Sequence, residues 1–349
     1  MIVLGTHPRS TNAGLSNQRM ALLGLMWHGI DRKAKVSFPK DLIDYRERER
    51  PGRDPFPAVF DAEAMTALLA RYDLFTTKPP TELIEWKECF GAGCWRIARI
   101  RESEACKALV FDFFRASLSA SALREAACRI RNRIGEETVA VQLRVERNWQ
   151  AYMDKLESEN RLSIGEEQLR TPEEIFARIV ATPELEGRTR FFCCSDEDKL
   201  DEPPAQIARR MRDRLGIELL FSSDLGEPLP ASGLMRTAVK FDLCAGLSEY
   251  VGLTRSTFSN ILCLCRAAQG LPGRDFIFNA AAPRVVQRHD MGISVEPQWA
   301  TLQEETRKFA GLSTIFFTEA RSATFPQICK GVGLVPNRWT LRSVTAQAP

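Results

Sequence analysis

The chain has 349 residues, of which 44% are hydrophobic and 27% are charged, a composition typical of a folded globular protein. Its 48 basic and 45 acidic side chains leave a formal net charge of only +3, which argues against nucleic-acid binding as its main task. The length predicts two domains of ordinary size.

The chain begins with a strand–loop–helix–strand pattern. Residues 2–7 are expected to form a strand, residues 23–30 carry apolar side chains at helical spacing, and residues 34–38 are expected to form a second strand. The loop between the first strand and the helix contains Gly14 and Asn17. Because ligands commonly bind at the first loop of such a unit, this loop is a candidate binding element.

The rest of the first part is predicted to be mainly helical. The charged, proline-containing stretch 44–57 is typical of an exposed loop. Residues 60–86 and 103–134 carry helical apolar patterns. Gly91 and Gly93 form an isolated glycine pair, which is most often a turn.

A regular alternation of strands and helices begins near residue 137. The predicted elements are strand 139–145, helix 173–181, strand 190–194, helix 203–215, strand 217–222, helix 234–246, strand 249–253 and helix 257–268. Crossovers of ten or more residues imply a parallel sheet covered by helices. We therefore predict an α/β protein with two Rossmann-like domains facing a cleft, 1–135 and 136–285, followed by a segment of unassigned role, 286–349.

The strand predicted at 139–145 ends in charged residues. An arginine at that end, Arg144, is permanently cationic and can bind a phosphate with two parallel hydrogen bonds. Glu146 lies two residues on and is expected on the same face. It can serve as a general base or form a salt bridge with Arg144 or Arg147. A strand whose polar edge simply meets water is the alternative.

A second candidate anion site lies at the start of the helix predicted at 257–268. Ser256 or Thr257 suits the helix N-cap, since a hydroxyl can accept a hydrogen bond from a free backbone N–H. A strand, a tight turn and a helix start with free donors suit a diphosphate. Ordinary helix capping is the alternative.

Cysteine and histidine usage predicts neither a disulfide framework nor a zinc site. Many of the ten cysteines lie in apolar runs, no C-x-x-C pair exists, and His7, His28 and His289 are far apart in the sequence. No signal-peptide pattern, glycosylation sequon or long apolar run is present. We expect a cytoplasmic chain with free thiols, no metal and no transmembrane segment.

Three short blocks carry a family resemblance. They are NAGLSNQR at 12–19, the strand end Gln142-Leu143-Arg144, and a strand-to-helix block with Asp242, Glu249, Gly252 and Ser256-Thr257-Phe258-Ser259. In order and spacing they resemble the fucosyltransferase superfamily, which includes protein O-fucosyltransferases, α-1,6-fucosyltransferases and bacterial nodulation fucosyltransferases.

The resemblance implies a fold of the GT-B type and an activity. The chain would transfer fucose from GDP-fucose to an acceptor hydroxyl by a metal-independent, inverting mechanism, with no cofactor beyond the donor. The cation Arg144 and the turn at 256–259 can stabilise a leaving diphosphate without a metal. Glycan, lipid-linked sugar and peptide acceptors are all compatible with the sequence.

The resemblance also implies residue roles. Arg144 would bind the β-phosphate and stabilise the departing diphosphate, with Glu146 as the nearest candidate base. The remaining donor-binding positions are Gly14 and Asn17 in the first loop on the sugar side, Gln142 at the strand end, Asp196 at an acidic strand-end position, Asp242 as hydrogen-bond acceptor for guanine, and Ser256, Thr257 and Phe258 around the phosphates.

One position departs from the family pattern. The family has histidine where this chain has Gln142. Glutamine can donate and accept hydrogen bonds at once but cannot carry a proton. A base-reading role can therefore persist at this position, whereas a titrating role cannot.

Other functions are compatible with the same residues. The chain could use another nucleotide sugar, or it could be a non-catalytic nucleotide- or glycan-binding relative in which Gln142 marks lost activity. A plain interaction scaffold is a further alternative. The presence of Arg144 together with Ser256 and Thr257 argues against the non-catalytic alternatives, since a scaffold needs none of them.

Overall fold

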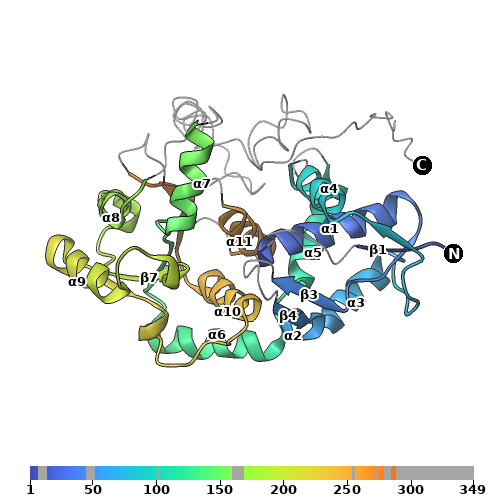
Figure 1. The fold of residues 1–349 in the computed structure, drawn as a ribbon, viewed down its shortest axis with the longest axis horizontal. Coiled ribbons are helices and arrows are strands. Elements are labelled where there is room, and N and C mark those ends of the chain that lie inside the picture. The colour runs from blue at the N-terminus through green and yellow to red at the C-terminus, as the bar shows by residue number, and fades with distance from the viewer. Residues whose placement is uncertain are drawn as a thin grey trace.

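The computed structural model describes most of the chain up to residue 287. The described ranges are 1–6, 14–44, 52–98, 100, 103–158, 169–253, 256–271, 274–278 and 284–287. Within them, the strands form a small parallel sheet, a larger sheet that is parallel except for one edge strand, and one antiparallel pair, with helices packed around the sheets (Figure 1). None of the helices in these ranges has the length and apolar character needed to cross a membrane.

The smaller sheet confirms the strand–helix–strand opening. Its strand order is β2-β1-β5, with β1 (Val3–Thr6) paired in parallel to β2 (Lys35–Val36) and to β5 (Glu82–Ile84). Helix α1 (Leu15–Asp31) joins β1 to β2 and buries most of its length. The strand β5 lies in a stretch predicted to be mainly helical, because its three residues are too few to carry a clear alternation.

The prediction of an exposed loop at residues 44–57 is wrong for much of that stretch. Strand β4 (Gly52–Pro55) pairs in antiparallel fashion with β3 (Asp41–Asp44), and a short helix, α2 (Phe56–Val59), follows. The sequence looks exposed because it is charged, yet Asp54 is buried and accepts a hydrogen bond from the Ser232 hydroxyl at 2.5 Å. Residues 45–51 lie outside the described residues.

Two glycines let helix α4 (Trp86–Ala98) cross α1 at very short range. A Cβ on Gly24 would lie 1.7 Å from the Cys89 carbonyl oxygen, and one on Gly93 would lie 2.1 Å from the Met20 carbonyl oxygen. The turn predicted at Gly91 and Gly93 is therefore wrong. These glycines lie inside a helix, and Gly93 is there because a neighbouring backbone occupies the space of a side chain.

Helices from both halves of the chain share one hydrophobic core. Helix α5 (Glu104–Ala116) packs on α11 (Thr257–Ala268), and α6 (Ser121–Ile134) packs on α10 (Gly233–Gly246). Figure 1 shows α10 and α11 between the elements around α1 and those around α9. The expected domain boundary near residue 135 separates the two sheets, but it stays a prediction because the core is continuous across it.

The larger sheet confirms the predicted α/β class with parallel strands. Its order is β11-β10-β9-β6-β7-β8, parallel except for β11. The strands are β6 (Val139–Gln142), β7 (Arg190–Cys194), β8 (Glu218–Leu220), β9 (Tyr250–Leu253), β10 (Asp275–Phe278) and β11 (Val286–Gln287). The further helices are α3 (Ala62–Arg71), α7 (Arg147–Ser158), α8 (Pro172–Val180) and α9 (Pro204–Leu215), with short 3₁₀ turns η1 (Pro183–Leu185), η2 (Glu197–Lys199) and η3 (Ser222–Asp224). The C-terminal segment predicted from residue 286 lies outside the described residues beyond Gln287.

The strand predicted at 139–145 ends earlier than its alternation suggests. Strand β6 stops at Gln142, and α7 begins at Arg147 where no helix was predicted. Leu143 and Val145 are nevertheless buried, so the apolar alternation continues through the connection after the strand. Arg144 and Glu146 therefore lie in a loop at the strand end and not on the strand itself.

Replacing Gly24 with alanine tests the close crossing of α1 and α4. The added methyl group has no room against the Cys89 carbonyl, so Gly24→Ala should destabilise the fold by about 1–3 kcal/mol through overpacking. Denaturant unfolding of the purified protein measures this loss. Gly52→Ala is the matched control, since the nearest atom to its Cβ is 3.8 Å away, and it should change stability by less than about 0.5 kcal/mol. Equal stability of the two variants would contradict the crossing.

Candidate functional site

Four of the predicted site residues, Gln142, Arg144, Glu146 and Asp196, lie where the strand order of the larger sheet reverses. From β6 the chain continues to β7 and β8 on one side, and then to β9 and β10 on the other. Strand β6 pairs in parallel with both β7 and β9, so the loops after β6 and β9 diverge at its carboxyl end. Such a reversal leaves a crevice at the strand ends, and it is there that open α/β sheets bind ligands.

A buried hydrogen-bond network joins the end of β6 to the start of α11. The Ser259 hydroxyl donates to Gln142 Oε1 and accepts the Leu253 backbone N–H at 3.1 Å. The Tyr250 hydroxyl lies 2.8 Å from Ser259 Oγ and 3.3 Å from Gln142 Oε1. Burial raises the pKa of Tyr250 well above its usual value, so its hydroxyl stays protonated and available as a donor. Gln142 thereby fixes α11 against the sheet.

The N-terminus of α11 has the predicted cap. Ser256 is the N-cap residue, and its hydroxyl accepts the Ser259 backbone N–H at 3.4 Å. Thr257 and Phe258 form the first turn and are half-buried, with the Phe258 ring packed edge-on against Phe241 at 5.3 Å between centroids. The first N–H groups of a helix lack helical partners, so this end offers backbone donors to an anion. Residues 254 and 255, just before the cap, lie outside the described residues.

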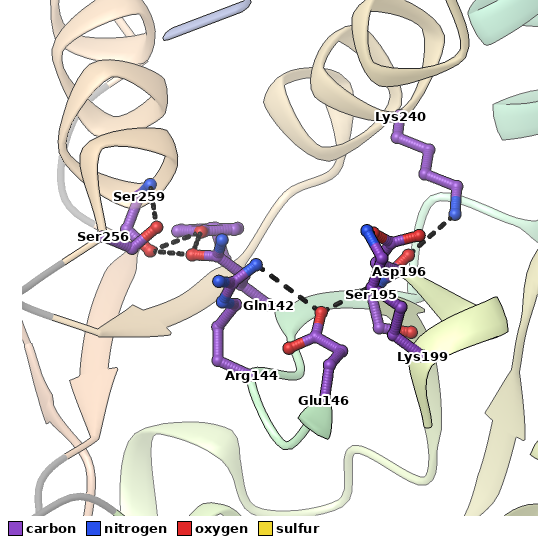
Figure 2. A network of polar contacts seen from close by, with 10 residues as sticks. Gln142, Arg144, Glu146, Ser195, Asp196, Lys199, Lys240, Ser256 and Ser259 are labelled. Atoms are coloured by element: carbon purple, nitrogen blue, oxygen red, sulfur yellow. Dashed lines mark hydrogen bonds and ion pairs between the residues drawn. The ribbon is translucent and has the colours of Figure 1, made fainter. Parts of the chain in front are cut away.

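Arg144 and Glu146 form an ion pair at the same edge of the sheet. Arg144 Nη1 lies 3.5 Å from Glu146 Oε1, and its guanidinium carbon lies 4.4 Å from the centroid of the Trp149 ring. Glu146 is fully buried, and its Oε1 accepts the backbone N–H of Asp196 at 2.9 Å (Figure 2). The salt bridge, one of the two roles expected for Glu146, is therefore present. Its role as a general base stays a prediction.

A polar pocket lies beside the ends of β7 and β8. Its volume is about 460 Å³, within the range of small-molecule sites. The side of the pocket nearest the ion pair is formed by Asp196, which pairs with Lys199 at 2.5 Å. Further lining residues include Glu197, Ser222, Ser223, Arg236 and Lys240.

Lys240 holds the wall of this pocket together. Its Nζ donates to the Ser195 carbonyl at 2.9 Å (Figure 2). The same Nζ lies 3.2 Å from Glu197 Oε1. Glu197 Oε1 also accepts the Ser222 backbone N–H at 3.0 Å. Only 8% of Lys240 is exposed, so its charge acts in a partly desolvated setting where electrostatic interactions are strong.

Asp242 lies on a different face of α10 from Lys240. Two residues correspond to about 200° around a helix, and Asp242 accordingly faces Arg19, Ser119 and Arg124 of the first half of the chain. Burial raises the pKa of the Asp242 carboxyl, an effect partly offset by the Arg19 guanidinium and by a hydrogen bond from Ser119. Its Oδ2 is buried without a hydrogen-bond partner in the described ranges. Its predicted contact with guanine stays a prediction.

The first-loop residues lie at the start of α1. Gly14 is the N-cap of α1 in an extended conformation, and no atom of the described residues lies within 4 Å of the position of a Cβ. Asn17 follows in the first turn, half-buried, and its Oδ1 lacks a hydrogen-bond partner among residues the structure describes. Because α1 packs on α10 and α11, Asn17 comes from an element next to those that carry Asp242 and Phe258.

The structure thus unites most of the predicted residues and adds others. Gln142, Arg144, Glu146 and Asp196 lie at the ends of neighbouring strands, connected through Ser259 to the α11 start. Sequence reasoning missed polar residues whose contacts are with residues far away in the sequence, namely Ser222, Arg236, Lys240 and Tyr250. The one available signal was Lys240 itself, a lysine between two apolar residues of the predicted helix.

Metal-binding groups and disulfides are not seen in the part of the chain that the structure describes. No cluster of three or more His, Cys, Asp and Glu side chains there could hold a metal ion. None of the nine cysteines in those ranges forms a disulfide with another described cysteine, and all but Cys128 are buried.

The fold is similar to that of POFUT1. The crystal structure of POFUT1 in complex with GDP matches with a TM-score of 0.52 at 14% sequence identity, covering 78% of this chain and 97% of that chain. POFUT1 in complex with GDP-fucose matches with a TM-score of 0.51 at 14% identity, covering 79% and 97%. The apo form gives 0.51 at 13% identity, covering 79% and 97%. A scan against protein families found no match, and a search of curated proteins found none either. At this identity, the likeness establishes a shared fold.

Substitution of Glu146 tests its structural role. Glu146→Ala removes the carboxylate that accepts the Asp196 N–H and pairs with Arg144, so it should lower the free energy of unfolding by about 1–3 kcal/mol. Glu146→Gln keeps an oxygen that can accept the Asp196 N–H, so it should cost less. Guanidinium unfolding of both variants measures the difference, and equal losses would contradict the proposed hydrogen bond.

Proposed function

We propose that the protein is a glycosyltransferase that transfers fucose from GDP-fucose to an acceptor hydroxyl. The observation that carries the proposal is the Gln142–Ser259 hydrogen bond, which joins the strand end two residues before Arg144 to the first turn of α11. A cation and a set of free backbone donors at one point suit a diphosphate. POFUT1, which has this fold, has been crystallised with GDP and with GDP-fucose, and this supports the same donor here.

The diphosphate is proposed to lie between Arg144 and the first turn of α11. Thr257 and Phe258 would offer backbone N–H groups and Ser256 its hydroxyl, since the Ser256 N–H already donates to the Leu253 carbonyl. Arg144 would contact the phosphate nearest the sugar. The pocket at β7 and β8 lies one to two strand spacings along the sheet edge, about 5–10 Å away. A nucleotide sugar that lies along the strand ends is therefore long enough to reach this polar pocket, which has Asp196 on its wall.

Two carboxylates near α10 have the chemistry to accept the N1–H and N2–H₂ groups of guanine. Glu197 Oε1 already accepts from Ser222 and Lys240. Asp242 retains one oxygen without a hydrogen-bond partner among the described residues. Because Glu197 is already held in an ion pair with Lys240, while a buried oxygen of Asp242 lacks a hydrogen-bond partner among the described residues, we assign guanine recognition to Asp242, with Asn17 approaching the sugar from α1.

The proposed chemistry is inverting displacement at the anomeric carbon. The acceptor oxygen forms a bond to that carbon while the bond to the phosphate oxygen breaks, and the leaving GDP carries the electron pair. Arg144, held by Glu146 and Trp149, is preorganised to stabilise the charge that grows on the diphosphate, so no metal is required. The acceptor proton would pass to a base, and Glu146 can take this part only if its buried carboxylate becomes accessible.

A nucleotide panel tests the donor. If a carboxylate of this protein binds guanine, the protein should bind GDP and reject UDP and ADP, because the wrong base leaves buried polar groups unpaired. Calorimetry should therefore show at least about 100-fold tighter binding of GDP. Equal binding of UDP would remove the guanine assignment and favour a transferase with another nucleotide sugar.

Measuring GDP, UDP and ADP binding to two variants identifies the carboxylate that binds guanine. Asp242→Asn should abolish the preference for GDP, whereas the matched change Glu197→Gln should leave it. The reverse result would place guanine in the pocket.

Substitution of Arg144 tests the leaving-group role. Removing one preorganised charge stabiliser typically costs on the order of 10²–10³ in rate, so Arg144→Ala should lower turnover by that factor. Arg144→Lys should also be poor, since an ammonium group cannot form the planar two-pronged contact. Release of fucose onto an acceptor, or onto water, measures turnover.

The matched variant for this test is Glu146→Ala. If Arg144→Ala kept near-normal turnover while Glu146→Ala abolished it, Glu146 would carry the chemistry instead. If GDP bound but neither fucose transfer nor hydrolysis occurred, the chain would be a non-catalytic nucleotide-binding relative.

A further inference from the structure

Arg19 is a buried cation at the junction of the two halves of the chain. It lies on α1 with only 1% of its surface exposed. Its guanidinium carbon is 4.1 Å from the centroid of the Phe241 ring on α10 and 5.4 Å from that of Phe60. A guanidinium between two aromatic rings gains cation–π attraction, but the rings cannot accept its hydrogen bonds as oxygen atoms would.

The hydrogen bonds of Arg19 are too few to explain its burial. Its Nη2 reaches Ser119 Oγ at 3.5 Å, the limit of a hydrogen bond, and its Nε and Nη1 have no partner in the described ranges. Arg266 on α11 is almost as buried, at 3%, yet it donates to the carbonyls of Ala245 at 2.9 Å and Ser248 at 2.9 Å.

The comparison separates two uses of a buried arginine. Arg266 also pairs with Asp275 at 2.7 Å, so its charge is satisfied and it contributes to the fold. Replacing a poorly paired buried charge by an apolar side chain of similar volume is often neutral or stabilising. Stability alone therefore does not account for Arg19.

The neighbours of Arg19 belong to the proposed donor site. Phe241 packs on Phe258 in the first turn of α11. Asp242, next to Phe241 on α10, lies within electrostatic range of Arg19. Asn17 lies two residues before Arg19 on α1. One side chain thus connects the elements that carry the three proposed ligands of base, phosphate and sugar.

We propose that Arg19 is a positioning residue for donor binding, which holds Asp242 as a carboxylate and keeps Phe241 and Phe258 in place. The inference rests on the proposed function and deepens it. Arg19 touches no substrate in this scheme. It acts through Asp242, whose acceptor role requires a negative charge, and through the ring that supports the α11 start.

The effect of the Arg19 charge on Asp242 can be detected in the pH dependence of GDP binding. The groups that face Asp242 are Arg19 from α1, Arg124 from α6 and the Ser119 hydroxyl, while Cys265 from α11 faces Arg19. Burial raises the pKa of Asp242 and Arg19 opposes the rise. Loss of Arg19 should therefore raise that pKa further, so that acidification protonates Asp242, and weakens GDP binding, at a higher pH than in the wild type.

The test compares Arg19→Met, Arg19→Lys and the control Arg266→Met. Arg19→Met should keep a melting temperature within a few degrees of the wild type or above it, but bind GDP at least about tenfold more weakly at pH 7. The pH midpoint of GDP binding should move upward. Arg19→Lys should restore the midpoint, since it keeps the charge, but recover affinity only in part because it lacks the planar group. Arg266→Met should lower the melting temperature and leave GDP affinity and midpoint unchanged.

The outcomes separate this inference from the proposed function. Wild-type protein that does not bind GDP would overturn both. Wild-type binding with an unchanged affinity and midpoint in Arg19→Met would overturn the role of Arg19 alone. An Arg19→Met protein that fails to fold, or that loses as much thermal stability as Arg266→Met, would show that Arg19 is structural and would also overturn the inference.

Discussion

Parallel pairing of β6 with both β7 and β9 is the constraint from which the site follows. It forces the loops after β6 and β9 to diverge, and two hydrogen bonds then fix the residues that flank the gap. Gln142 is bound to Ser259 on the β9 side, and Glu146 is bound to the Asp196 backbone on the β7 side. Arg144 lies between these two attachments, so its position is set by the sheet and not by its own flexible chain. A cation held in this way reorganises little when charge develops near it, which is the condition for strong electrostatic stabilisation.

The polar groups at the two ends of the larger sheet are satisfied to different degrees. At the amino end, the buried carboxylate of Glu249 pairs with Arg188 at 2.6 Å and with Arg274. At the carboxyl end, Arg144 Nε and Glu146 Oε2 are buried without hydrogen-bond partners among the described residues. Unpaired buried groups cost stability. Their presence at the end of the sheet where we propose that the donor binds fits a site whose partners arrive with a substrate, whereas Glu249, Arg190 and Asp275 at the amino end are held in ion pairs.

The sequence predicted those features that depend on local pattern. Helix α11 begins at the predicted residue because Ser256 is a strong N-cap, and β7 matches because its apolar run is bounded on both sides. The errors arise where tertiary contacts outweigh local signals. Strand β4 looks like a charged loop because the partner of Asp54 lies 178 residues away, at Ser232. The position of Arg144 near a strand end could be predicted from the apolar alternation before it. The contribution of Lys240 depends on Ser195 and Glu197, which only the folded chain brings near.

The glutamine at position 142 is explained by the hydroxyl groups around it. Gln142 Oε1 lies within hydrogen-bond distance of both Ser259 Oγ and Tyr250 Oη. A carbonyl oxygen has two lone pairs and can accept from both hydroxyls, whereas a neutral imidazole has one acceptor nitrogen and an imidazolium has none. In a buried network where Tyr250 stays protonated, glutamine therefore satisfies one more donor than the histidine of the resembled family would. A glutamine at this position carries no titrating group and still connects β6 to α11, two residues before Arg144 in the chain.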